Sequence, residues 1–285
     1  MSISIEASYI KPGTVEEAVT LLAAGEARIL SGGTDFYPAL GERVVRGRVV
    51  DVSALRDLRG VSSERDHFRI GGLTTWTEII RTPLPRCFDA LKSAAREVGS
   101  VQIQNRGTVA GNLVNASPAA DGVPPLLALD AEVELLSQAG VRKMPLGDFI
   151  VGNRKTRRTP DELLTAVLVP RKLEDAASSF VKLGARRYLV ISISMVAVVV
   201  LVNDSQQVSE ARVAVGSCSA VARRLRALEH DLVGTSVRDG LGSIVRPQHL
   251  TDLSPIDDVR ATAEYRMDAA LRLVQRALNS CVENG

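Results

Sequence analysis

Two stretches of the sequence, well separated along the chain, are rich in glycine and small polar residues. The first covers residues 31–35, S-G-G-T-D, and the second covers residues 106–121, R-G-T-V-A-G-N-L-V-N-A-S-P-A-A-D. Such stretches offer backbone N–H groups that no side chain obstructs, together with short hydroxyl and amide groups, and these groups suit phosphate binding. We therefore expect the two stretches to face each other across one nucleotide.

The second stretch is the more specific of the two. Its small residues are more numerous than turn geometry requires: Thr108, Asn112, Asn115, Ser117 and Asp121, with Gly107 and Gly111. A Gly-Gly turn needs only a position with positive φ, so the first stretch alone is equally typical of a tight turn without a ligand. The sequence has no G-x-G-x-x-G after a strand, no phosphate-binding P-loop and no G-x-S-x-G motif. This excludes the usual dinucleotide and hydrolase motifs.

The remaining reactive side chains show no comparable grouping. His67, His230 and His249 lack the spacing of metal ligands, and we expect structural or surface roles for them. The three cysteines are far apart, so this chain alone cannot build an iron–sulfur cluster or a paired-cysteine zinc site. No acid–base pair or nucleophile constellation stands out. If the chain is part of an enzyme, its chemistry belongs to a bound cofactor.

Composition narrows the class of protein further. A chain of 285 residues suggests two or three domains, and 45% apolar with 24% charged residues is typical of a soluble globular protein. The net charge of +2 gives no electrostatic argument for binding nucleic acid or a membrane. The apolar run at 189–202 is short for a membrane span and β-branched, which favours a buried strand. With no signal peptide recognisable, we expect a cytoplasmic protein without a membrane span.

The first stretch lies in a predicted β-α-β-loop-β unit. Strands are expected at residues 3–9, 27–30 and 49–53, and helices at 14–25 and 36–40. Thr14 and Glu17 form a capping box at the start of the first helix. The Gly-Gly turn comes directly after a strand, where ligands of open α/β sheets tend to bind.

Two further units follow. For the second we expect strands at 60–63, 67–71, 131–137, 141–144 and 163–169, helices at 75–79, 85–98 and 124–129, a loop over 106–121 and a basic loop at 153–160. For the third we expect strands at 180–183, 189–202 and 208–215 and helices at 221–232 and 258–278. Residues 170–172 are the best candidate for the boundary between them, because the elements become longer there.

Several motifs, in order along nearly the whole chain, resemble the FAD-binding (medium) subunit of the molybdenum hydroxylase family, which includes xanthine dehydrogenase and carbon monoxide dehydrogenase. They are ILSGGTDFYPAL (29–40), IGGLTTWTEI (70–79), GSVQIQNRGTVAGNLVNASPAAD (99–121), DELLTAVLVP (161–170) and PIDDVRATAEYR (255–266). The third motif is long enough to be specific. The first departs slightly from the family, since many relatives carry Asn where this chain has Asp35.

The resemblance implies an α+β fold and non-covalent FAD. Two α/β FAD-binding subdomains of the PCMH-type flavin fold, 1–58 and 59–172, precede a C-terminal α+β domain, 173–285, with a small antiparallel sheet and helices. The cofactor contacts that it implies are Leu30, Ser31, Gly32, Gly33, Thr34 and Asp35 from the first motif, Thr108, Gly111, Asn112, Ser117 and Asp121 from the third, and Leu164 and Lys182 nearer the adenine or flavin ring. It implies no catalytic residue and no metal ligand on this chain.

The resemblance also implies partners. A large subunit with the molybdopterin cofactor would oxidise the substrate, and [2Fe-2S] clusters on a small subunit would pass electrons to FAD on this chain, in a heterotrimer or a dimer of heterotrimers. The final acceptor would be NAD⁺, oxygen or another carrier. Two alternatives stay open: a stand-alone flavin oxidase or reductase of the same wider fold, which should carry a substrate domain with acid–base residues, and a nucleotide-binding scaffold without a redox role.

Overall fold

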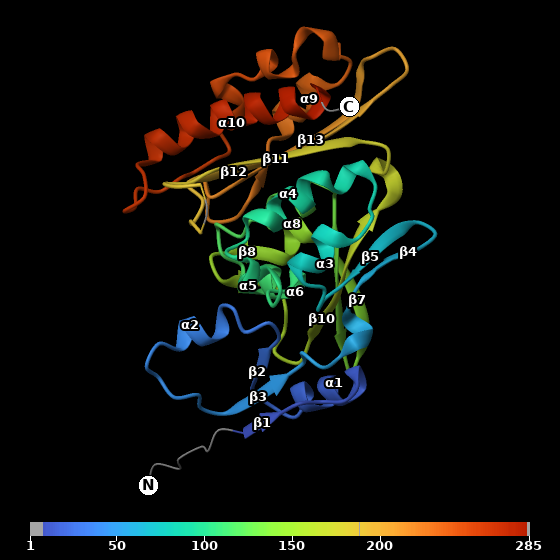
Figure 1. Cartoon of the computed structure of the whole chain (residues 1–285), viewed down its shortest axis with the longest axis vertical. Coiled ribbons are helices and arrows are strands. Elements are labelled where there is room, and N and C mark those ends of the chain that lie inside the picture. Colours follow the sequence, from blue (N-terminus) through green and yellow to red (C-terminus); the bar gives the residue numbers. More distant parts are fainter. Residues whose placement is uncertain (1–7, 188, 284–285) are drawn as a thin grey trace.

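The computed structural model describes residues 8–187 and 189–283. Three sheets follow one another along the long axis of the molecule, and a two-stranded hairpin lies beside the middle one (Figure 1). The N-terminal strands occupy one end and the longest helix covers the other. The α+β class predicted from the sequence is confirmed.

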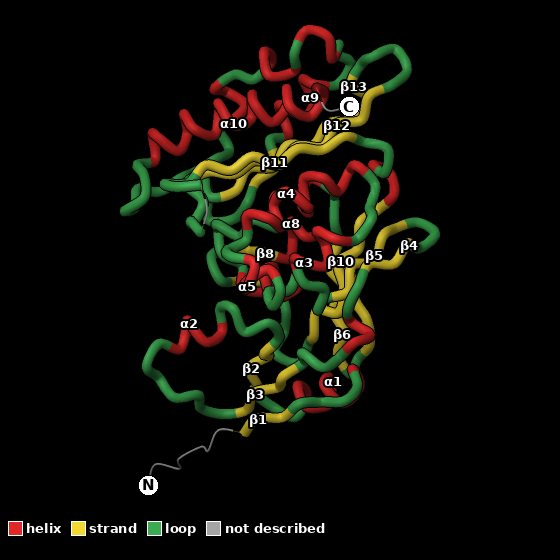
Figure 2. Tube along the Cα trace, in the orientation of Figure 1, coloured by secondary structure: helices red, strands yellow, loops and turns green. Residues whose placement is uncertain are grey.

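The N-terminal unit is a small parallel sheet. Its strands are β1 (Ser8–Ile10), β3 (Arg48–Asp51) and β2 (Ala27–Leu30) in spatial order, with helices α1 (Val15–Ala23) and α2 (Phe36–Leu40) and a 3-10 turn, η1 (Arg56–Leu58). Its apolar cluster includes Leu22 and Val50 and also takes in Leu73 and Leu163 from the middle unit. After α2 a long loop returns the chain to β3 (Figure 2).

Two sequence predictions for this unit need comment. Residues 3–7 of the strand expected at 3–9 lie outside the described residues, and β1 begins at Ser8. The capping box of α1 is only half formed. The Thr14 hydroxyl accepts from the Glu17 N–H, but the Glu17 carboxylate accepts from the Gly13 N–H instead of returning to Thr14.

The middle unit is built on five antiparallel strands. Their spatial order is β4 (Val61–Ser63), β5 (His67–Gly71), β10 (Leu163–Pro170), β6 (Glu132–Ser137) and β7 (Gly140–Pro145). The helices are α3 (Trp76–Arg81), α4 (Asp89–Glu97), α5 (Val101–Gln104), α6 (Val109–Asn115), α7 (Val123–Ala128) and α8 (Leu146–Phe149), with a 3-10 turn, η2 (Arg86–Phe88), and the hairpin β8 (Ile150–Gly152) and β9 (Lys155–Thr156). β10 is central and buried nearly throughout, as its continuous apolar sequence predicts.

The C-terminal unit is an antiparallel sheet with helices on its outer face. The strands are β11 (Ala177–Leu183), β12 (Ser194–Val202), β13 (Val208–Gly216) and β14 (Arg223–Arg224), in that order. The helices are α9 (Arg226–Leu232) and α10 (Ala263–Glu283), and the 3-10 turns are η3 (Arg171–Leu173), η4 (Val237–Asp239), η5 (Leu241–Ile244) and η6 (Pro247–Leu250). Helix α10 packs on β11 and β12, while α4 contacts the opposite face of the same sheet (Figure 1). Helix α7 contacts β12 and β13 from that face as well.

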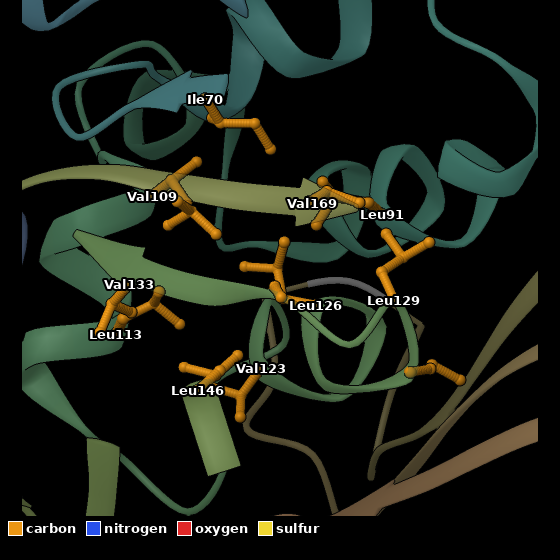
Figure 3. Close-up of a cluster of buried hydrophobic side chains, with 14 of the residues drawn as sticks. Ile70, Leu91, Val109, Leu113, Val123, Leu126, Leu129, Val133, Leu146 and Val169 are labelled. Carbon is orange, nitrogen blue, oxygen red and sulfur yellow. The ribbon is translucent and has the colours of Figure 1, made fainter. Parts of the chain in front are cut away.

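Strand β12 therefore belongs to two hydrophobic cores. Val196, Val198 and Val200 face the cluster formed with α9 and α10. Ala197 and Val199 face the other way, into the cluster that holds Leu126, Val133 and Val169 of the middle unit (Figure 3). Alternation of side chains along a strand gives both faces an apolar surface. The inner face of the C-terminal sheet consequently belongs to the core of the middle unit.

Other segments differ from the sequence prediction. The stretch 106–121 is not a plain loop, because α6 lies within it. The helix expected at 221–232 begins only at Arg226, because Arg223 and Arg224 pair with β13 as an edge strand. The strand expected at 189–202 begins at Ser194, and Leu189 has φ 53°. The last helix begins at Ala263 instead of 258, since Asp258 caps a turn by accepting from the Arg260 N–H. Val259 lies within the helix expected at 258–278 but precedes α10, and it is 99% exposed.

Candidate cofactor site

A cavity of about 980 Å³ lies between the N-terminal and middle units. Its walls include Ser31, Gly32, Gly33, Thr34 and Asp35 from the first glycine stretch, Thr108, Gly111, Asn112 and Asn115 from the second, and Leu164. A volume of this order is at the upper end of the range for small-molecule and cofactor sites. The structure thus brings the two stretches together around one cavity.

The first stretch, residues 31–35, meets the second through close contacts that select glycine. A Cβ added to Gly32 would lie 1.9 Å from the backbone oxygen of Arg106, so only glycine allows this approach. Gly33 has φ 74°, in the left-handed region that glycine adopts without strain. The hydroxyl oxygens of Ser31 and Thr108 lie 3.0 Å apart and link the two stretches directly.

The backbone N–H groups of the two stretches differ in their availability. Among the described residues, no N–H of residues 31–35 donates to a protein atom. At the start of α6 the corresponding groups are used: the Val109 and Ala110 N–H groups donate to the backbone oxygens of Thr74 and Gly72, and the Gly111 N–H donates to Thr108 Oγ1. Free donors for a phosphate therefore lie on the first stretch. The expectation of open N–H groups along the second is wrong for the start of α6.

Asn112 adds an acceptor to the cavity wall. Its Oδ1 is buried and has no hydrogen-bond partner among the described residues. A buried acceptor without a donor costs on the order of 1–3 kcal/mol. This oxygen lies close to Gly122 and is out of reach of solvent, so the amide of Asn112 must shift before a ligand can donate to it.

Arginines give the cavity an excess of positive charge. Arg28, Arg43, Arg46 and Arg158 line it, against the carboxylates of Asp35 and Glu42. Burial lowers the pKa of the Arg158 guanidinium, and Glu162 and Asp161 oppose that shift. An excess of cations beside unpaired N–H groups favours an anionic ligand. The apolar remainder of the wall includes Phe36, Val52, Leu73, Trp76 and Leu163.

Four residues implied by the family resemblance do not line the cavity: Leu30, Ser117, Asp121 and Lys182. Leu30 is buried at the end of β2, directly before the first glycine stretch. The Ser117 hydroxyl accepts from the Ala119 N–H at 3.3 Å.

Asp121 and Lys182 form a buried ion pair instead. Lys182 Nζ lies 2.7 Å from Asp121 Oδ2, and the Ser192 hydroxyl donates to Asp121 Oδ1 at 2.8 Å. Both charged side chains are less than 10% exposed, at 9% and 6%. Burial raises the pKa of Asp121, and the charge and hydrogen bond of Lys182 act against that shift. The pair joins the segment before α7 to β11.

Sequence reasoning missed most of the cationic wall. Arg28, Arg43 and Arg46 flank the first glycine stretch, but charges near a turn are usually solvated and gave no signal of their own. The segment expected as a basic loop at 153–160 includes the turn of the β8–β9 hairpin. In the structure Arg158 lines the cavity, and Arg154 bonds to Asp35 and Asn115.

Across residues 8–187 and 189–283, no helix has both the length and the apolar content needed to cross a bilayer. Within those ranges no group of three His, Cys, Asp or Glu side chains is arranged to hold a metal ion.

The fold and the cavity match a known class of flavoproteins. Residues 4–172 match the family described as the FAD binding domain in molybdopterin dehydrogenase, and residues 179–281 match the CO dehydrogenase flavoprotein C-terminal domain. The chain therefore belongs to the FAD-binding subunits of the molybdenum hydroxylase family, which are components of oxidoreductases. This confirms the family predicted from the motifs.

Individual relatives agree with this assignment. The chain is 36% identical over 234 residues to the nicotinate dehydrogenase FAD-subunit of Eubacterium barkeri, covering 79% of each chain. It is 31% identical to the putative xanthine dehydrogenase FAD-binding subunit of Escherichia coli, over 97% of this chain and 96% of that one. Among solved structures, carbon monoxide dehydrogenase from Oligotropha carboxidovorans matches all of both chains with a TM-score of 0.87 and 25% identity. Quinoline 2-oxidoreductase from Pseudomonas putida 86 has the same fold, with a TM-score of 0.89 and 24% identity over 98% of each chain.

Proposed function

We propose that this chain is the FAD-carrying electron-transfer subunit of a multi-subunit molybdenum hydroxylase. The observation that carries the proposal is the first glycine stretch: its N–H groups have no partner among the described residues, and they lie on a cavity wall with excess positive charge. Family membership narrows the anionic ligand to FAD.

The groups on the cavity wall fit the parts of FAD. The N–H groups of residues 31–35 are donors for the pyrophosphate, and Asn112 contributes its amide side chain to the wall. Leu164 and its apolar neighbours offer a surface for the ring systems. We propose direct roles for the predicted residues on the wall. For Leu30, Ser117, Asp121 and Lys182 we propose an indirect one, in which the buried Asp121–Lys182 pair and its surroundings fix the wall in place.

The work of this chain is to hold and orient the cofactor non-covalently. FAD, when bound, supplies the reversible uptake and release of electrons. We propose an iron–sulfur small subunit and a molybdopterin large subunit as partners, carrying the [2Fe-2S] clusters and the molybdenum cofactor, in a heterotrimer or a dimer of heterotrimers. NAD⁺, oxygen or another carrier would accept the electrons, in the cytoplasm. The proposal of partner subunits is supported by relatives that are themselves named as subunits. One is the carbon monoxide dehydrogenase medium chain of Hydrogenophaga pseudoflava, which is 26% identical over 95% of this chain.

We further propose that the working units are residues 1–58, 59–172 and 173–285. Each contains one of the three larger sheets, and the candidate cavity lies between the first two.

The test is to isolate the full chain gently with the subunits that co-purify and to record its absorbance and cofactor content. We expect a flavin spectrum, FAD released by acid precipitation, and partner chains that contain iron, sulfide and molybdenum. Protein that stays colourless after incubation with FAD would contradict the proposal and favour a scaffold. Oxidation of a substrate by the isolated chain with its flavin, without partners, would favour a stand-alone flavoenzyme.

A further inference from the structure

Arg154 connects the two walls of the cavity. It lies at the turn of the β8–β9 hairpin, and its Nη1 donates to Asp35 Oδ2 at 2.8 Å and to Asn115 Oδ1. Asp35 belongs to the first glycine stretch and Asn115 to the end of α6, and both line the cavity. One guanidinium nitrogen therefore bridges residues of the N-terminal and middle units.

The backbone of Arg154 is fixed where it stands. Its N–H donates to the backbone oxygen of Ala116 at 2.9 Å, and it has φ 54°, in the left-handed region. Non-glycine residues adopt that region at a cost, and they do so where the surrounding structure determines it. The hairpin is thus anchored on the end of α6, and only the side chain of Arg154 reaches across to Asp35.

The charge of Asp35 is unusual for its position. A carboxylate in a stretch whose free N–H groups suit a pyrophosphate would repel that anion, because like charges in a partly buried site interact unfavourably. Arg154 supplies the nearest counter-charge, in an ion pair whose side chains are 55% and 48% exposed.

We propose that Arg154 is a positioning residue whose charge neutralises Asp35, so that the first glycine stretch can accept the cofactor's pyrophosphate. This inference rests on the proposed function, since it concerns retention of FAD. The β8–β9 hairpin then contributes to the cofactor site through Arg154 and is not only a solvated surface loop.

The experiment measures FAD binding to the deflavinated full-length chain by quenching of flavin fluorescence. Arg154→Gln leaves Asp35 without its counter-charge, and we expect the dissociation constant to rise about fivefold, as for the loss of roughly 1 kcal/mol. Asp35→Asn in the same chain removes the repelling charge. We expect the Arg154→Gln/Asp35→Asn double variant to bind FAD more tightly than Arg154→Gln, because the uncompensated carboxylate is gone.

A neighbouring residue provides the control. Lys155→Gln removes one positive charge from the same hairpin, but Lys155 makes no ion pair among the described residues, and we expect wild-type binding. Added salt should reduce the defect of Arg154→Gln, because it screens the repulsion between Asp35 and the phosphates. Thermal unfolding of each apoprotein checks that the fold is retained.

Each outcome decides between explanations. Recovery in the double variant supports charge compensation. A double variant as weak as Arg154→Gln would mean that Arg154 only ties the walls together, and would overturn the inference, as would wild-type binding by Arg154→Gln. If the wild-type chain itself does not bind FAD, the proposed function fails and not this inference alone.

Discussion

The middle unit is joined to its two neighbours in different ways. Toward the C-terminal unit it shares a continuous apolar core through β12, reinforced by the buried Asp121–Lys182 pair and by Asp130, which bonds to Arg212 and Arg224. Toward the N-terminal unit the apolar cluster is small, and the glycine stretches meet through hydroxyl and backbone contacts beside a cavity. One boundary is built like a domain interior and the other like a binding site.

The difference shows where a ligand can contribute most. Loss of a shared apolar core exposes much surface, so the C-terminal boundary should open only with global unfolding. The N-terminal boundary buries less apolar surface, so opening it costs less free energy. A bound cofactor would add contacts to both walls of its cavity. Ligand binding stabilises the state that binds it, so the N-terminal boundary should gain stability from FAD while the C-terminal one changes little.

The largest expected effect is at the C-terminal boundary. Lys182→Ala leaves the buried carboxylate of Asp121 without its partner, and removing one member of a buried ion pair typically costs about 3–5 kcal/mol. Urea unfolding of the apoprotein measures this loss. Lys172→Ala is the matched control, because the Lys172–Glu210 pair has a 61% exposed lysine and should contribute about 1 kcal/mol or less. Equal losses in the two variants would show that the boundary does not depend on the buried pair.

A smaller effect than that of Lys182→Ala is expected at the N-terminal boundary, and it should appear in FAD affinity more than in the free energy of unfolding. Gly32→Ala forces the first stretch away from the backbone oxygen of Arg106, and overpacking of this kind costs about 1–3 kcal/mol. We expect FAD affinity to fall roughly tenfold to a hundredfold, measured by fluorescence titration. Gly13→Ala, whose Cβ would meet only Glu17 Oε2 at 3.7 Å, should bind normally. Unchanged affinity in Gly32→Ala would remove the first stretch from the site.

The smallest effect is a pH dependence at the C-terminal boundary. Burial alone would raise the pKa of Asp130, but the hydrogen bonds and charges of Arg212 and Arg224 outweigh it and hold that pKa below its usual value. The stabilisation is therefore present above the ordinary aspartate pKa of about 3.9 and is lost as the pH falls through the lower folded-state value. Because Asp130 is partly exposed, we expect about 1 kcal/mol or less.

Thermal unfolding between about pH 5 and pH 2.5 spans this aspartate titration. The Asp130→Asn variant should start less stable and lose less stability on acidification than the wild type. Parallel curves for the two proteins would show that the carboxylate does not hold the boundary.

Much of the fold could be predicted because its signals are local. The strands expected at 67–71 and 163–169 form as β5 and β10, and the helix expected at 75–79 forms as α3, with a complete capping box of Thr75 and Glu78. These patterns depend on neighbours a few residues away. The same holds for the glycine stretches, whose composition indicated a shared cavity.

The missed features depend on distant partners. Helix α6 contains Gly111 and Asn112, which favour helices weakly, and its first N–H groups bond to the backbone oxygens of Gly72 and Thr74 far earlier in the chain. The two arginines of β14 form a strand only because the edge of β13 is available beside them. Arg154 had no pattern that pointed to Asp35. Single-sequence reasoning could not find these contacts, because no local period encodes them.

The mixed membership of the N-terminal apolar cluster has a consequence for biosynthesis. Leu163 belongs to the same apolar cluster as Leu22 and Val50, although the ribosome makes it long after both. The N-terminal unit leaves the ribosome first, but its apolar cluster stays incomplete and partly exposed to solvent until β10 has been synthesised. Chains that stall between β3 and β10 should be preferred substrates for chaperones and proteases, because they expose apolar surface that the finished protein hides.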